Sequence, residues 1–143
     1  MAREKALEGF RREQCATPAL GSDTIVLLDG DILGKPGSKS EAETMLQRLS
    51  GRTHQVCTAV ALVLGPEYIL DTLNITAVTF GVMPNEWIEH YCQSEEPMDK
   101  AGAYAVQGGA GQYVSRIEGS YSSVMGLPLF ETAGLLRQAG LLV

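Results

Sequence analysis

Acidic, basic and amide side chains lie close together in one short stretch of this chain, from Asp99 to Gly108. Asp99 and Lys100 begin the stretch and Gln107 comes near its end, with mostly small residues between them. Glycine and alanine let a backbone approach a ligand closely. Because a glutamine amide both donates and accepts hydrogen bonds, Gln107 could read the edge of a nucleobase. The stretch therefore predicts one loop of a ligand site.

Two further polar patches stand beside apolar runs, one around Asp23 and one around Lys35. The carboxylate of Asp23 could act as a general base or hold a metal ion, although an aspartate before a strand also commonly closes a turn. Lys35 precedes Pro36, which favours an extended backbone and could aim the lysine at phosphate oxygens. A solvated surface lysine is the simpler interpretation. Together the three patches predict one site assembled from separate loops.

Simpler interpretations also exist for the other polar residues. Asp99 and Lys100 could form an exposed ion pair of little energetic value, and Gln107 could bond to neighbouring loop backbone. The glycine run after Gln107 lacks the Lys-Ser/Thr ending of a phosphate-binding P-loop. His54 and His90 each lack a second ligand at metal spacing. The residues alone therefore leave the chemistry open.

The composition is typical of a globular protein. The chain has 143 residues, of which 45% are hydrophobic and 20% charged, so we expect residues 1–143 to form a single domain. A net charge of −6 argues against binding along DNA or RNA backbones. No apolar run is long enough to cross a bilayer, no secretory core follows Met1, and the three cysteines lack metal spacing. We expect a cytoplasmic protein.

The elements that must position these residues alternate between helix and strand patterns, which predicts a mixed α/β fold. Two long β-favouring segments flank Gly65-Pro66-Glu67 and predict an antiparallel hairpin. Helices are expected over 2–13, after Ser40, after Pro84 and after Pro128, and strands over Thr24–Leu28, 53–64, 69–80 and Tyr113–Ile117.

Shorter signals mark the ends of these elements. Asp29-Gly30 predicts a tight turn, and Ser40-x-x-Glu43 predicts a capping box at the start of a helix. The segment from Gly119 to Ser123 is expected to be a polar loop.

With these residues in view, the chain resembles the Maf family of nucleoside triphosphate pyrophosphatases over nearly its whole length. Within this family the chain most resembles the subgroup that hydrolyses dTTP and UTP. Two features match that subgroup: Thr24 directly follows Asp23, and Gln107 is present. The 7-methyl-GTP subgroup typically has glutamine at the position of Thr24. The segments that carry the resemblance are Ala2-Arg3-Glu4-Lys5-Ala6, Gly21-Ser22-Asp23-Thr24-Ile25-Val26, Leu33-Gly34-Lys35-Pro36, Met45-Leu46 through Ser50-Gly51-Arg52-Thr53-His54, Glu96-Pro97-Met98-Asp99-Lys100-Ala101-Gly102-Ala103-Tyr104 and Gly119-Ser120-Tyr121 through Gly126-Leu127-Pro128-Leu129.

The resemblance implies a Maf/ITPase-like twisted mixed sheet with a long antiparallel hairpin flanked by helices. It also implies a mechanism in which a divalent cation, Mg²⁺ or Mn²⁺, bridges the triphosphate and a water molecule. Asp23 would be the catalytic proton acceptor for that water, which attacks the α-phosphorus and releases pyrophosphate. The substrate-binding residues would be Lys5, Lys35 and Lys100 on the phosphates, and Thr24 and Gln107 on a pyrimidine with a 4-oxo group.

The resemblance further implies a biological role and an assembly state. The expected role is cleansing of nucleotide pools, with links to septum formation, and the expected assembly is a homodimer. Family members begin with a strand and a Ser-x-Ser-Pro-Arg-Arg loop that this sequence lacks, so we expect an N-terminally truncated Maf-like domain. The alternative function is an inactive nucleotide-binding or dimerising module.

Overall fold

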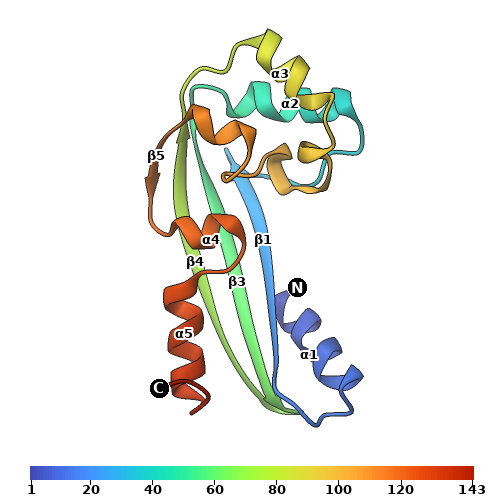
Figure 1. Ribbon diagram of the computed structural model, residues 1–143, viewed down its shortest axis with the longest axis vertical. Coiled ribbons are helices and arrows are strands. Elements are labelled where there is room, and N and C mark those ends of the chain that lie inside the picture. Colours follow the sequence, from blue (N-terminus) through green and yellow to red (C-terminus); the bar gives the residue numbers. More distant parts are fainter. The chain divides into compact units, whose positions relative to one another are not determined.

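The computed structural model describes residues 1–143, which form helices and the strands of one sheet (Figure 1). The mixed α/β class is thus confirmed. The α-helices are α1 (Ala2–Arg12), α2 (Lys39–Leu49), α3 (Asn85–Cys92), α4 (Tyr121–Met125) and α5 (Leu129–Gln138). The strands are β1 (Ala19–Leu28), β2 (Asp31–Leu33), β3 (Thr53–Gly65), β4 (Tyr68–Phe80) and β5 (Val114–Glu118). Short 3₁₀ turns are η1 (Glu96–Asp99), η2 (Ala101–Ala103) and η3 (Gly109–Tyr113).

The five strands follow the order β2-β1-β3-β4-β5. β1 pairs with β2 in antiparallel fashion, and β4 pairs likewise with β5. Neighbouring strands β3 and β4 are joined only by Pro66 and Glu67, a connection that antiparallel strands alone permit. The long antiparallel hairpin is therefore confirmed. The predicted tight turn is also confirmed, since Asp29 and Gly30 have φ angles of 52° and 83° and join Leu28 to its partner Asp31.

The chain divides into two compact units. The first contains residues 1–24, 58–74 and 122–143, and the second contains residues 25–57 and 75–121. β3 is buried on both faces in the first unit, because alternate residues of a strand face opposite ways. Ala61 and Val63 pack with α1, whereas Val60 and Leu62 pack with Leu135 of α5.

The second unit is built around α2 and α3 and an aromatic cluster (defined as His54, Phe80 and Tyr104). The predicted helix after Ser40 is confirmed as α2, and its apolar residues at helical spacing are all buried: Ala42, Met45, Leu46 and Leu49. The predicted helix after Pro84 is confirmed as well, with Pro84 at the N-cap of α3.

β1 is longer than the sequence indicates. It begins at Ala19 rather than at Thr24, so Asp23 lies within the strand, and the interpretation of Asp23 as a turn residue is wrong. The reason is tertiary contact: at Gly21 an added Cβ would lie 2.6 Å from the backbone oxygen of Ala2. Only glycine lets the backbone of α1 approach β1 so closely.

Two short local predictions are corrected. The N-cap of α2 is Ser38 rather than Ser40, because Ser38 Oγ accepts the backbone N–H of Glu41 at 3.1 Å; Glu41 Oε2 in turn accepts the N–H of Gly37, just before the N-cap, at 2.9 Å. The expected polar loop before Ser123 instead runs into α4, which starts at Tyr121.

The cysteines differ in their exposure. Cys15 is exposed just after α1, whereas Cys57 and Cys92 are buried, with 8% and 1% of their surface exposed. None of the helices combines the length and the apolar character that crossing a membrane requires.

Candidate active site

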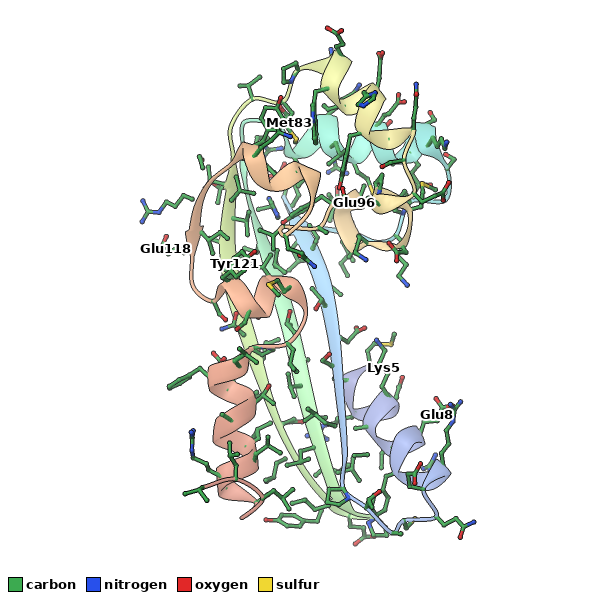
Figure 2. All side chains as sticks on the ribbon, viewed as in Figure 1. Lys5, Glu8, Met83, Glu96, Glu118 and Tyr121 are labelled. Atoms are coloured by element: carbon green, nitrogen blue, oxygen red, sulfur yellow. The ribbon has the colours of Figure 1, made fainter.

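Asp23 and Lys5 form an ion pair in the first unit. Lys5 Nζ donates to Asp23 Oδ1 at 2.8 Å and to the carbonyl oxygen of Ser22 at 3.2 Å. Lys5 projects from α1, where Figure 2 labels it, and the close approach at Gly21 holds that helix against the strand carrying Asp23. The Asp23 side chain is 20% exposed and that of Lys5 is 53% exposed. A partly shielded carboxylate beside a reachable ammonium group is suited to proton transfer next to an anion.

Thr24 takes part in a chain of hydroxyl hydrogen bonds. Its Oγ1 lies 2.9 Å from Thr58 Oγ1, and Thr58 in turn donates to the carbonyl oxygen of Ser123 at 2.8 Å. A threonine hydroxyl has one hydrogen, so Thr24 must be the donor to Thr58. Thr24 therefore retains only acceptor capacity for a ligand. Because neighbours in a strand face opposite ways, Thr24 faces α4 whereas Asp23 faces α1.

The loops that carry Lys35 and Lys100 meet in the second unit. The N–H of Gly102 donates to the carbonyl oxygen of Gly34 at 3.1 Å, which joins the two loops one and two residues from the lysines. Gly102 has a φ of +73°, and a Cβ there would lie 3.1 Å from a Val26 methyl group. A glycine is thus needed for this close approach, and it brings two predicted cations onto adjoining loops.

The side chains of both lysines reach solvent. Lys35 is exposed, and Lys100 Nζ donates to Asp99 Oδ1 at 3.2 Å with 40% of the lysine side chain and 71% of the aspartate side chain exposed. Ion pairs with this exposure contribute little to stability. Lys100 can therefore exchange Asp99 for a phosphate oxygen at small cost.

Gln107 is exposed between buried Val106 and half-buried Gly108. Two residues farther along, the N–H of Gly109 donates to the carboxylate of Glu96. Sequence reasoning missed both Glu96 and Thr58. No spacing rule links them to their partners, because their contacts depend on how intervening turns and strands fold.

The surroundings of His54 indicate a structural role. It is 2% exposed, its Nε2 lies 2.6 Å from the hydroxyl of Tyr104, and its ring stacks on Phe80 with centroids 5.5 Å apart. Burial lowers the pKa of His54 to about 4 and raises the pKa of Tyr104 above its ordinary value. Both groups are therefore uncharged at neutral pH and join β3 to the loop after Lys100.

The six predicted site residues fall into two sets. Lys5, Asp23 and Thr24 belong to the first unit, whereas Lys35, Lys100 and Gln107 belong to the second. Contacts within the first unit join Lys5 to Asp23, and contacts within the second join the Lys35 and Lys100 loops. That both sets meet one ligand stays a prediction.

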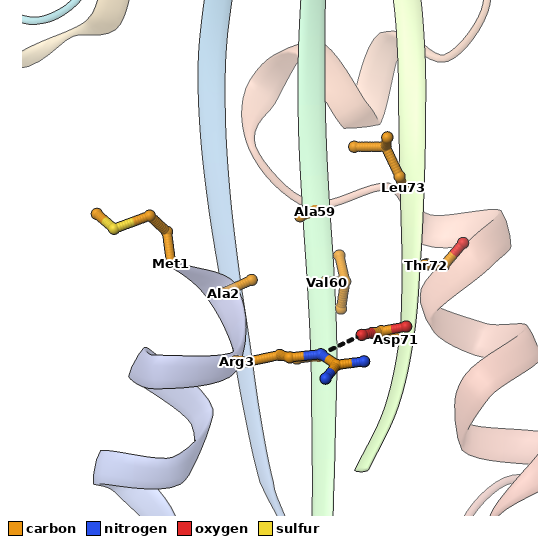
Figure 3. A pocket seen from close by; sticks show the side chains of 9 residues that line it. Met1, Ala2, Arg3, Ala59, Val60, Asp71, Thr72 and Leu73 are labelled. Carbon is orange, nitrogen blue, oxygen red and sulfur yellow. Dashed lines mark hydrogen bonds and ion pairs between the residues drawn. The ribbon is translucent and has the colours of Figure 1, made fainter.

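A pocket of about 360 Å³ lies elsewhere in the first unit (Figure 3). The start of α1 and the facing parts of β3 and β4 line it, and an ion pair between Arg3 and Asp71 crosses it. None of the six predicted site residues is part of its lining. This pocket is therefore distinct from the predicted site.

The carboxylates bear on the metal that the resemblance implies. Residues 1–143 hold no group of three or more His, Cys, Asp or Glu side chains that could bind a metal ion by themselves. Magnesium is commonly bound by one or two carboxylates together with the phosphates of its substrate. The carboxylate of Asp23, one oxygen of which accepts from Lys5, fits binding of a magnesium ion that is shared with substrate phosphates.

Comparisons with known proteins agree on one family. The sequence profile described as "Maf-like protein" matches residues 1–139. The chain is 56% identical to the dTTP/UTP pyrophosphatase of Cupriavidus pinatubonensis, over 92% of this chain and 66% of that protein. It is 51% identical to the enzyme of the same name from Bordetella avium (98% and 71% covered) and 52% identical to that of Escherichia coli K12 (95% and 68% covered). The chain thus spans about two thirds of the length of these relatives.

Proposed function

The chain belongs to the Maf family, and we propose that it is a nucleoside triphosphate diphosphatase that hydrolyses dTTP and UTP to the monophosphate and pyrophosphate. The observation that carries the proposal is the Asp23–Lys5 pair, since it provides a proton acceptor and a cation at one point of the chain. The names of the similar proteins support the choice of substrate.

The proposed reaction is a displacement at phosphorus. Asp23 accepts a proton from a water molecule as the water oxygen bonds to the α-phosphorus. The bond from the α-phosphorus to the oxygen that bridges to the β-phosphorus breaks, and pyrophosphate leaves with that electron pair. Asp23 then returns its proton to solvent, which restores the carboxylate.

Lys5 can orient both the Asp23 carboxylate and the substrate phosphate for this step. An ammonium group has three N–H donors, of which two point at Asp23 and at the Ser22 carbonyl oxygen. The third can meet a phosphate oxygen of a bound triphosphate. Lys35 and Lys100 would offset the charge on the other phosphate oxygens.

A divalent cation, Mg²⁺ or Mn²⁺, is part of the proposal. Asp23 and the phosphates of the substrate would hold it, since residues 1–143 have no group of three or more His, Cys, Asp or Glu side chains that could bind it by themselves. When bound, it neutralises charge on the phosphate oxygens.

Selection of the base would fall to Thr24 and Gln107. Because Thr24 gives its hydrogen to Thr58, it can only accept a hydrogen bond from a base. Thymine and uracil carry an N–H at ring position 3 where cytosine has a bare acceptor nitrogen, so an acceptor that meets this position favours the 4-oxo bases. The Gln107 amide has both a donor and an acceptor, so it can bond either to the 4-oxo group or to the ring N–H of the base.

The proposal extends to the cellular setting. We place the enzyme in the cytoplasm, where nucleoside triphosphates are made and used, with cleansing of nucleotide pools as its task. A homodimer and a link to septum formation follow from the family resemblance alone.

The test is pyrophosphate release from a panel of nucleoside triphosphates with Mg²⁺ or Mn²⁺. We expect dTTP and UTP to be the best substrates. Asp23→Asn should lower kcat by roughly a hundredfold to ten-thousandfold, because the amide cannot accept the proton. Its thermal midpoint should stay close to that of the unsubstituted chain, because the amide oxygen can still accept from Lys5.

Asp31→Asn is the matched control, since Asp31 is an exposed carboxylate that pairs with Arg48 on the surface. It should leave turnover unchanged. Normal turnover by Asp23→Asn would contradict the role of that carboxylate. Binding of UTP without pyrophosphate release would support instead a nucleotide-binding module.

A further inference from the structure

We propose that Glu96 is a positioning residue for Gln107. Its carboxylate holds the glycine turn that follows Gln107 and so fixes the direction in which the Gln107 amide meets a nucleobase. This inference rests on the proposed function, in which Gln107 helps to select the base.

The contact joins two turns of the second unit. Glu96 opens η1 and Gly109 opens η3, and the N–H of Gly109 lies 3.3 Å and 3.2 Å from the two carboxylate oxygens of Glu96. Hydrogen bonds from an N–H to a charged carboxylate are stronger than neutral ones. Figure 2 labels Glu96 among the turns of this unit.

The residue between Gln107 and this hydrogen bond is packed against the same carboxylate. A Cβ added at Gly108 would lie 1.7 Å from Glu96 Oε1, a distance that no pair of non-bonded atoms can adopt. A Cβ at Gly109 would lie 3.3 Å from the ring of Tyr91. Glu96 therefore occupies the space beside Gly108 that a side chain would otherwise take.

The other side of Gln107 is anchored as well. Val106 is 6% exposed, and its carbonyl oxygen would lie 2.5 Å from a Cβ at Gly111, so the chain folds back tightly on it. The N–H of Gly108 also donates to the carbonyl oxygen of Ala105 at 3.0 Å. With a buried residue before it and a carboxylate-held turn after it, exposed Gln107 has little freedom at its backbone.

The first measurement compares kcat/KM for UTP with kcat/KM for CTP. Glu96→Ala should reduce this ratio by about tenfold, the value of one hydrogen bond, and Gln107→Ala should reduce it by a similar factor. Glu96→Gln should retain most of the preference, because its amide oxygen can still accept from Gly109. The control is Glu95→Ala, which removes an exposed neighbouring carboxylate without a hydrogen bond or ion pair and should change nothing.

The double variant Glu96→Ala/Gln107→Ala distinguishes positioning from general stability. If Glu96 acts through Gln107, the double variant should have the same ratio as Gln107→Ala, within about twofold. The proposal would be overturned if the losses of UTP preference in the two single variants multiplied in the double variant. An unchanged ratio in Glu96→Ala would overturn it as well.

A second measurement does not depend on turnover. Amide hydrogen exchange at Gly109 should become at least tenfold faster in Glu96→Ala than in the unsubstituted chain and in Glu95→Ala. Equal exchange in all three would refute the Glu96 anchor even if the enzyme is active. Faster exchange in Glu96→Ala, in a chain that hydrolyses no nucleotide, would retain the anchor and refute the proposed function.

Discussion

His54 is buried where a charged imidazolium would have no counter-ion. Its neighbours are the ring of Phe80 and the hydroxyl of Tyr104, and neither carries charge at neutral pH. Burial favours the neutral form, which is why the pKa of His54 is lowered to about 4 from 6.5. An unfolded chain exposes the imidazole, and it then takes up a proton near pH 6.5.

Because of His54, we expect the folded chain to lose stability in acid. Between pH 6.5 and pH 4 the unfolded chain binds a proton that the folded chain does not, so unfolding becomes easier as the pH falls. The stabilisation from His54 is complete above pH 6.5 and declines through this window, by on the order of 3 kcal/mol in total. Urea unfolding at a series of pH values measures it as the slope of the unfolding free energy against pH.

Two variants separate His54 from the other titrating groups. His54→Gln cannot titrate, so the slope between pH 6.5 and pH 4 should become smaller even if the variant is less stable at every pH. His90→Gln alters an exposed histidine on α3 and should leave the slope as it is. An unchanged slope in His54→Gln would show that the acid sensitivity has another source.

At the scale of single elements, the start of α2 shows how a side chain fixes a helix boundary. The sequence offers two overlapping capping boxes, Ser38-x-x-Glu41 and Ser40-x-x-Glu43. Ser38 has the extended backbone that an N-cap requires, with φ −156° and ψ 165°, and its hydroxyl satisfies the N–H of Glu41. Ser40 lies inside the first turn, where its carbonyl oxygen accepts from Thr44.

The two serines therefore predict different costs. Ser38→Ala should lower the free energy of unfolding by about 1 kcal/mol, the usual value of an N-cap hydroxyl. Ser40→Ala should be close to neutral, since alanine is favoured within a helix. Chemical denaturation of both variants gives the comparison, and an equal loss in both would contradict the assigned boundary.

At the scale of the whole molecule, the elements with a clear period could be predicted from sequence. The hairpin of β3 and β4 and the apolar face of α2 follow from alternation and helical spacing, and the structure has both. The start of β1 could not be predicted, because Gly21 is a poor strand former whose place depends on contact with α1.

The candidate site, too, could be predicted from the sequence only in part. Residue types singled out Asp23 and Lys35 as possible site residues, and the resemblance added Lys5. Pairing of Lys5 with Asp23 depends on a helix packed on a strand, and the Glu96–Gly109 contact depends on successive turns. Contacts of this kind have no local pattern, so they emerge only when the chain is folded.

The unequal exposure of the three cysteines gives the folded molecule a chemical signature. Burial raises the pKa of Cys57 and raises that of Cys92 to about 11, which keeps both sulfurs protonated as well as covered. Iodoacetamide should therefore alkylate Cys15 alone in native buffer and all three thiols in denaturant, as mass spectrometry would count. Each chain that opens would acquire two more adducts, so the adduct number follows the unfolded population, and rapid triple labelling without denaturant would contradict this burial.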